Sequence, residues 1–305
     1  MFQTQAAIFY YAVSPVHMGA GTSVGVVDNP IQRERHTEHP CFAGSGLKGA
    51  FRHHFAATQV EDSANLGNLE HLLFGPPSAG ELHAGAVSLG DAQLVAFPVR
   101  SLKESYAYVT CPLALARAQR LLAITGLTVD WKIPCPTQGA CAVSGPALLV
   151  DKKLYLEVFE YTANEDSAII AIANDLAKLG LPDSTEFQFF TKKISQHLVV
   201  LNDTDFAYFA KNATLVEPHV RIDNETGAAK KGGLFYTENL PPEALLVGPV
   251  MASQSRAPIS TENLSAAAVM TAFKRVFDGN LLQIGGNATT GRGLVMLKFA
   301  EVAGQ

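Results

Sequence analysis

Few cysteines, few charges and no long apolar run mark this sequence, and each shortage excludes a class of protein. No apolar stretch approaches the roughly 20 residues that a membrane-spanning helix needs, so we expect no membrane partner. Residues Met1–Gln5 lack a basic segment and a cleavage site, so we expect no signal peptide and a cytoplasmic location. Cys41, Cys111, Cys135 and Cys141 show no paired CxxC spacing, which favours reduced, packed thiols over a metal site.

The common phosphate-binding motifs are absent as well. The glycines of Leu282–Gly293 are not followed by a Gly-Lys-Ser/Thr triplet, so this segment is not a P-loop. They precede the apolar segment Leu294–Phe299 and no helix, which excludes the dinucleotide-binding fingerprint. The segment is either a tight turn or a loop whose exposed N–H groups approach a phosphate backbone. A small-molecule enzyme that binds a nucleotide phosphate here is therefore disfavoured.

Low charge limits how the chain can bind nucleic acid. Charged residues make up 17% of the sequence and the net charge is −5, which argues against binding through bulk positive charge. The segment 33–54 nevertheless concentrates basic side chains, with Glu34 and Glu38 as its only acids. These side chains are Arg33, Arg35, His36, Lys48, Arg52, His53 and His54. A local stripe of this kind can follow a phosphate backbone on an otherwise acidic protein.

Hydrophobic periodicity predicts a mixture of strands and helices. Strands are expected at 6–13, 87–95, 97–102 and 294–299, and helices at 46–55, 113–126, 165–179 and 265–277. Turn residues at 223–227, followed by Gly232–Tyr236, predict a β-hairpin. Strand–helix–strand order at both ends indicates an α+β fold with a mainly antiparallel sheet. A chain of 305 residues permits one or two domains, and one elaborated domain over 1–305 is the expectation.

Several sequence blocks, in order along nearly the whole chain, resemble one known family. These blocks are His17 with the glycines after it, 25–37, Gly44–Gly49 with Arg52, 74–77, 97–103 with 106–110, Gly232–Tyr236 and Gln283–Asn287. They resemble the backbone subunit of type III-B CRISPR effector complexes, the Cmr member of the RAMP superfamily. The resemblance implies a modified ferredoxin-like (RRM-like) fold with a glycine-rich loop before the last strand. It also implies a protruding thumb, for which the hairpin at 219–238 is the candidate.

The resemblance further implies a function. Several copies of such a subunit line up along one crRNA guide with other Cmr subunits, and each thumb distorts the duplex between guide and complementary target RNA. The target's own 2′-hydroxyl then attacks the adjacent phosphate in line. The resemblance therefore implies an endoribonuclease whose activity depends on a divalent cation, Mg²⁺ or Mn²⁺. Sequence specificity then comes from base pairing, and the protein holds the duplex by shape and backbone.

Three residues are candidates for the chemistry. Asp28 follows an apolar pair and precedes Asn-Pro, so its carboxylate would bind a metal ion or a ribose; a loop aspartate bonded to backbone N–H groups is the alternative. The resemblance favours the catalytic role, because the matching aspartate is the one needed for target cleavage. His17 is an accessory acid or base, or a histidine satisfied by backbone. Glu238 is a weaker catalytic candidate, and a solvated carboxylate is the alternative.

Other residues are candidates for holding RNA. A helix over 46–55 would place Lys48 and Arg52 together on its outer face, toward guide phosphates, although Arg52 could equally pair with an acid. Gly46 stands where family members usually carry serine, so a hydroxyl contact is in doubt there. The glycine-rich loop would contact the same strand. Its candidates are Gly285, Gly286, Asn287, Thr290 and Arg292.

Three related alternatives stay open. The chain could be a scaffold subunit that binds guide RNA without cutting the target. It could be a stand-alone RAMP endonuclease that processes guide precursors, although such enzymes act as single subunits on a hairpin. A type III-A backbone subunit is a close relative of the same class, and the block at 26–34 favours type III-B.

Overall fold

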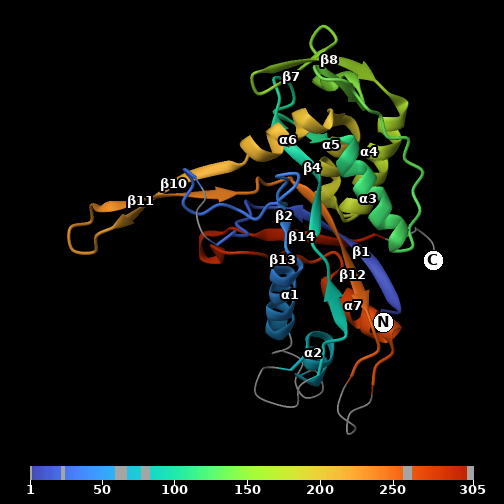
Figure 1. The fold of residues 1–305 in the computed structure, drawn as a ribbon, viewed down its shortest axis with the longest axis vertical. Helices are drawn as coiled ribbons and strands as arrows, with labels where there is room; N and C mark the ends of the chain where they lie inside the picture. The colour runs from blue at the N-terminus through green and yellow to red at the C-terminus, as the bar shows by residue number, and fades with distance from the viewer. Residues whose placement is uncertain (1, 22–24, 59–66, 77–82, 257–262, 301–305) are drawn as a thin grey trace.

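One large, mainly antiparallel sheet forms the centre of the protein (Figure 1). The computed structural model describes residues 2–21, 25–58, 67–76, 83–256 and 263–300. Within these residues, twelve strands pair in the order β13-β14-β1-β12-β4-β5-β9-β6-β8-β7, with β2 beside β4 and β3 beside β12. The pairs β5–β9 and β6–β8 are parallel, and the other pairs of this sheet are antiparallel. The antiparallel α+β architecture expected from the sequence is therefore confirmed.

The elements have the following bounds. The strands of the large sheet are β1 (Thr4–Ala12), β2 (Cys41–Phe42), β3 (Val87–Leu89), β4 (Ala92–Arg100), β5 (Tyr106–Thr110), β6 (Ala140–Val143), β7 (Lys153–Leu156), β8 (Phe159–Glu165), β9 (Leu198–Val200), β12 (Leu245–Ala252), β13 (Leu281–Gln283) and β14 (Leu294–Phe299). The helices are α1 (Gly44–Thr58), α2 (Gly67–Phe74), α3 (Pro112–Ile124), α4 (Ser167–Gly180), α5 (Gln188–His197), α6 (Asp203–Asn212) and α7 (Ala266–Phe277), with short 3₁₀ turns η2 (Pro146–Leu148), η3 (Thr185–Phe187) and η4 (Ala288–Thr290).

Strand β1 shows why the sheet is covered on both faces. It lies between β12 and β14, where Ile8 pairs with Gly248 on one side and with Phe299 on the other. Its even-numbered residues from Ala6 to Ala12 join one hydrophobic cluster, and its odd-numbered residues from Ala7 to Tyr11 join a second. Because side chains alternate across a strand, a strand that is apolar at every position needs a partner layer on each face.

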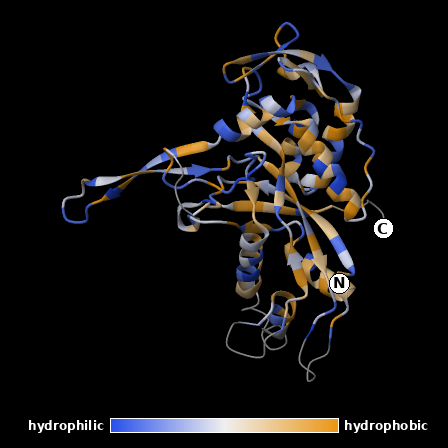
Figure 2. Ribbon diagram, in the orientation of Figure 1, coloured by the Kyte–Doolittle hydropathy of each residue, from blue (hydrophilic) through white to orange (hydrophobic). Residues whose placement is uncertain are grey.

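Helices supply those two layers. Phenylalanines of α1 and α7 pack on the first cluster, with the rings of Phe51 and Phe277 crossing at 4.7 Å between centroids. Apolar residues of α3, α4 and α5 form the second cluster with the other face of the sheet. Figure 2 shows hydrophobic residues concentrated along the central strands and the helices that cover them.

A two-stranded hairpin projects from this body (Figure 1). It is formed by β10 (Leu215–Ile222) and β11 (Ala229–Asn239), which pair antiparallel from Leu215↔Asn239 outward. The expected thumb segment at 219–238 lies within this hairpin. Its tip is closed by the Asp223 carboxylate, which accepts hydrogen bonds from the backbone N–H groups of Glu225 and Thr226. Its foot returns to the body beside the first loop of the chain.

The structure corrects several element boundaries. The expected break between two strands at residue 96 is wrong, because β4 runs unbroken through it and the break falls at Gly90-Asp91. At this break the Asp91 carboxylate accepts a hydrogen bond of 2.7 Å from the backbone N–H of Gly44, at the start of α1. Helix α1 consequently begins two residues earlier than expected. Helices α2, α5 and α6 have no counterpart among the expected elements.

Two sequence expectations concern the chain as a whole. In the part of the chain that the structure describes, no helix has both the length and the apolar character to cross a membrane. All four cysteines are free thiols. Cys111 and Cys141 are buried as expected and Cys41 is half-buried, whereas Cys135 is exposed, so the expectation of packing is wrong for Cys135. Burial raises the pKa of the Cys41 thiol to about 11 and that of the Cys141 thiol to about 12.

Candidate catalytic site and nucleic-acid interface

A pocket of about 320 Å³ lies at the foot of the hairpin. It brings together the turn after β1, the loop that carries Asp28, both hairpin strands and the glycine-rich loop. We call it the hairpin pocket. Its lining residues are His17, Asn29, His219, Phe235, Thr237, Asn239, Asn287, Thr290 and Arg292. Four predicted site residues, His17, Asn287, Thr290 and Arg292, therefore meet here although they lie at opposite ends of the sequence.

The glycine-rich loop is fixed against the turn that carries His17. The backbone N–H of Gly286 donates to the His17 carbonyl at 2.8 Å. Gly285 has φ of +78°, and a Cβ at this position would lie 2.2 Å from the same carbonyl oxygen. Glycine is required at 285 for both its left-handed backbone and its close approach. Beyond it, Asn287 and Thr290 are exposed and line the hairpin pocket.

The His17 ring is held by backbone on one side. Its Nδ1 lies 2.7 Å from the carbonyl oxygen of Glu238. A carbonyl oxygen can only accept, so Nδ1 carries a proton and donates it. In the neutral ring the Nε2 atom is then the acceptor. The alternative of a histidine satisfied by backbone thus holds for one ring nitrogen, while the residue still lines the hairpin pocket.

Asp28 is exposed beside the hairpin pocket and next to Asn29, which lines it. The Asp28 Oδ2 atom accepts from the backbone N–H of Tyr236 in β11, at 2.7 Å. Asn29 extends this contact, because its own N–H donates to the Tyr236 carbonyl at 3.0 Å. The alternative of an aspartate bonded to backbone N–H groups therefore holds for one oxygen of Asp28. The N–H group belongs to the hairpin and not to the loop that carries Asp28. It holds the carboxylate in place without burying it.

A divalent cation can be tested against these donors. In the described residues no group of three or more His, Cys, Asp or Glu side chains is placed to hold a metal ion. Asp28 offers an exposed carboxylate of which the structure assigns one oxygen to Tyr236. Mg²⁺ commonly binds through one or two carboxylates and takes its other ligands from water and substrate phosphates. One exposed carboxylate is compatible with such a cation, and a metal-ligand role for Asp28 stays a prediction.

Glu238 has surroundings unlike those of Asp28. It is only 6% exposed, so it is not the solvated carboxylate considered from the sequence. Its Oε1 accepts from Arg33 at 2.5 Å and from the Thr214 hydroxyl at 2.7 Å, and its Oε2 accepts from the backbone N–H of Ile31 at 3.1 Å. Its catalytic role remains a prediction, and its side chain points into the protein.

The hairpin itself supplies His219, Thr237 and Asn239 to the pocket, and sequence reasoning found none of these three. The rings of His219 and Phe235 stack across its two strands at 5.3 Å between centroids. The Asn239 side chain donates from Nδ2 to Glu217, while its buried Oδ1 has no hydrogen-bond partner among the described residues. Glu217 also accepts from Arg292 at 2.7 Å. Cross-strand pairing brings these residues together, and no local sequence pattern announces it.

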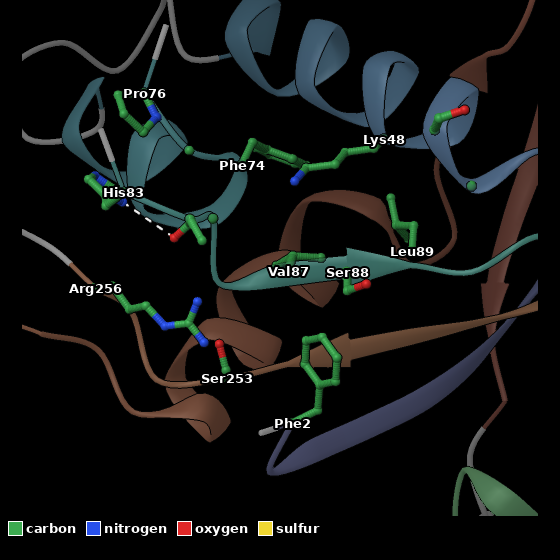
Figure 3. Close-up of a pocket in the computed structure, with 15 residues that line it drawn as sticks. Phe2, Lys48, Phe74, Pro76, His83, Val87, Ser88, Leu89, Ser253 and Arg256 are labelled. Carbon is green, nitrogen blue, oxygen red and sulfur yellow. Dashed lines mark hydrogen bonds between the residues drawn. The ribbon is translucent and has the colours of Figure 1, made fainter. Parts of the chain in front are cut away.

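Lys48 and Arg52 lie elsewhere, on α1. Lys48 lines a second pocket of about 600 Å³, which shares no lining residue with the hairpin pocket. Figure 3 shows Lys48 entering this helix pocket from one side and Arg256 from the other, with His83 at its rim. Arg256 and His83 were not found from the sequence, because each is an isolated basic residue in a loop. Arg52 pairs instead with Glu70 at 2.8 Å.

Comparison with known proteins identifies the class of protein. Over residues 9–296 the chain matches the RAMP superfamily. It is 34% identical over 296 residues to the CRISPR system Cmr endoribonuclease Cmr4 of Pyrococcus furiosus, covering 96% of this chain and 94% of that protein. It is 24% identical over 319 residues to the CRISPR system CMR subunit Cmr4 of Saccharolobus solfataricus, covering 95% of each.

Solved structures agree with this match. The crystal structure of oligomeric Cmr4 from Pyrococcus furiosus superposes with a TM-score of 0.72 at 28% identity, covering 99% of this chain and 100% of that one. A chain of the type III-B Cmr-beta complex bound to cognate target RNA shares the fold, with a TM-score of 0.71 at 19% identity and 98% coverage of each. The chain therefore belongs to the RAMP superfamily and, within it, to the Cmr4 family.

Proposed function

We propose that this chain is a backbone subunit of a type III-B CRISPR ribonucleoprotein. Further copies of the chain and other Cmr subunits assemble with it on a crRNA guide, and each copy cleaves complementary target RNA. A relative that shares 34% of its residues is named a Cmr endoribonuclease, and a solved relative is described as oligomeric. Both similarities extend over almost the entire chain, which supports the same role for the whole subunit.

One observation carries the enzymatic part of this proposal. Asp28 is an exposed carboxylate held by the backbone of a projecting hairpin, at the rim of a polar pocket. Glu238 differs, because both of its oxygens are buried among donors. A carboxylate that is oriented but solvent-facing remains available to a ligand.

The chemistry that suits these groups is internal transesterification of RNA. The 2′-oxygen forms a bond to the adjacent phosphorus and the bond to the 5′-oxygen breaks. A cyclic phosphate results, and the leaving 5′-oxygen takes a proton from water to become a 5′-hydroxyl. His17 Nε2 is the available acceptor for the 2′-hydroxyl proton, and Asp28 orients the ribose and phosphate. A divalent cation at Asp28, Mg²⁺ or Mn²⁺, would stabilise charge on the phosphate oxygens.

The guide strand has a separate place in the proposal. Lys48 and Arg256 face each other across the helix pocket, as two cations following one phosphate backbone would. In this proposal the exposed backbone of the glycine-rich loop contacts the same strand. Arg52 is assigned no phosphate, because Glu70 already pairs with it.

The test uses the complex assembled on guide RNA and a labelled complementary target, with and without Mg²⁺. The native chain should yield evenly spaced products carrying a cyclic phosphate, and chelation should stop the reaction. Asp28→Asn should abolish cleavage while target binding persists. Asp183→Asn is the matched control, since Asp183 is also exposed but lies beside neither pocket. Target that stays bound and intact with the native chain would instead support the scaffold alternative.

A further inference from the structure

Glu238 and Arg33 form an ion pair beneath the candidate catalytic residues. Their side chains are 8% and 16% exposed, so neither is available to RNA at the surface. Both carboxylate oxygens of Glu238 already accept hydrogen bonds, from Arg33, Thr214 and the backbone of Ile31. A metal ligand or a general acid would have to give up these bonds. The side chain therefore suits an internal tie better than a reacting group.

Arg33 extends the tie to two more segments. Its Nη1 donates to the carbonyls of Glu38 and Ala210, at 2.7 and 2.9 Å, and its Nη2 donates to that of Lys211 at 3.1 Å. The last two carbonyls belong to the C-terminal turn of α6, where a cation is favoured by the helix dipole. A single guanidinium thus joins the loop after Asp28, the end of α6 and the hairpin strand β11.

The backbone of the same strand segment holds both candidate catalytic residues. The Tyr236 N–H donates to the Asp28 carboxylate at 2.7 Å, and the Glu238 carbonyl accepts from His17 Nδ1 at 2.7 Å. Between them the Glu238 N–H donates to the Asn29 carbonyl at 2.9 Å. Any slip of β11 against the Asp28 loop would move the carboxylate and the imidazole together.

We propose that Arg33 and Glu238 are positioning residues for the cleavage reaction. Their ion pair fixes β11 against the loop that carries Asp28, and the Glu238 carbonyl keeps the His17 proton on Nδ1. Glu238 acts through Asp28 and His17 and does not touch the substrate. The effect on catalysis rests on the proposed function. The effect of the ion pair on the His17 ring can be measured without RNA cleavage.

Cleavage by the assembled complex gives the first test, at saturating target and in a single turnover. Glu238→Ala and Arg33→Ala should each lower the rate by roughly 10- to 100-fold, the range produced when catalytic groups are displaced by about 1 Å. Target affinity should stay within about twofold, because neither side chain reaches the surface. The double variant should be no slower than the slower single variant, since both substitutions break one tie.

Two further variants separate positioning from direct catalysis. Glu238→Gln keeps an amide oxygen for Arg33 and Thr214, so it should recover most of the rate that Glu238→Ala loses; a rate as low as that of Glu238→Ala would overturn the proposal. Arg117→Ala is the matched control. It breaks a comparably buried ion pair, with Glu34, whose side chains are 13% and 12% exposed. It should lower stability and leave the cleavage rate unchanged.

The second measurement is the ¹⁵N spectrum of the His17 ring in the full free chain, assigned by His17→Gln. The native neutral ring should carry its proton on Nδ1, whereas Glu238→Ala and Arg33→Ala should shift it toward the Nε2–H form. Thermal melting identifies a temperature at which every variant is folded, with Arg33→Lys as the milder substitution. An unchanged ring signal would overturn the proposal. If the native complex failed to cut RNA, the proposed function would fail, yet this signal would still decide the positioning.

Discussion

Gly285 and Gly291 offer a matched pair of substitutions in the glycine-rich loop. Both have φ of +78°, but a Cβ at 285 would lie 2.2 Å from the His17 carbonyl oxygen, whereas a Cβ at 291 would meet nothing within 4 Å. Alanine at either position therefore incurs the same backbone strain, and only Gly285→Ala also meets an obstacle. That obstacle is main chain, which cannot rotate away as a side chain would.

The expected difference follows from these contacts. The left-handed conformation costs alanine about 1–2 kcal/mol at each position. Gly285→Ala adds about 1–3 kcal/mol for overpacking and about 1 kcal/mol for the bond from Gly286 N–H to the His17 carbonyl, which the displacement breaks. Gly291→Ala should thus destabilise the chain by about 1–2 kcal/mol and Gly285→Ala by about 3–6 kcal/mol.

Denaturant unfolding of the free chain measures both values, and target cleavage measures the consequence for His17. We expect Gly291→Ala to cleave at close to the native rate. Gly285→Ala should cleave slowly even at temperatures where it is folded, because its loop pushes the His17 backbone out of place. Equal destabilisation by the two substitutions would show that the loop does not rest on His17 as described.

Two more predictions concern charge. Lys48→Ala should weaken guide binding and reduce the slope of log affinity against log salt by about 0.7–0.9 per subunit. Arg52→Ala should change this slope little, because the Arg52 side chain is already paired with Glu70. Equal slopes for both variants would contradict the assignment. Burial raises the pKa of the Glu243 carboxyl to about 7, so the folded chain binds its proton more tightly than the unfolded chain does. The free energy of unfolding should consequently fall by about 1–3 kcal/mol as the pH rises from about 4.5 to about 7, and Glu243→Gln should remove this slope in pH-dependent melting experiments.

Local features of the fold could be predicted from the sequence. Helix α7 lies where its periodicity indicates, because Ser265 accepts from the Ala268 N–H at its start and the apolar side chains recur on one face. Strand β1 and the hairpin likewise follow from apolar runs and turn residues. Each of these signals depends on neighbours in the chain, so a sequence contains them in full.

The composition of the site could be predicted only in part. His17 and Asp28 stand out in sequence, yet their partners on β11 lie more than 200 residues away. Asn239 and His219 enter the hairpin pocket through cross-strand register, and Glu238 is buried by a contact with Arg33 that no spacing rule encodes. Arg52 differs from Lys48 only through Glu70, which belongs to another helix. Long-range pairing decides which charged residues are free, and a single sequence does not display it.

The turn after β1 links the two pockets. His17 lines the hairpin pocket, whereas the side chain of the next residue, Met18, lies over α1, where a Cβ on Gly46 would be 2.5 Å from its methyl group. Because that methyl is the end of a flexible side chain, it can move aside, and a serine at 46 is sterically tolerable. Gly46 leaves space for the Met18 side chain and is not needed for an unusual backbone conformation. Consecutive residues thus contact the helix that carries Lys48 and the pocket that adjoins Asp28. The main chain at His17 and Met18 therefore lies between α1 and the glycine-rich loop.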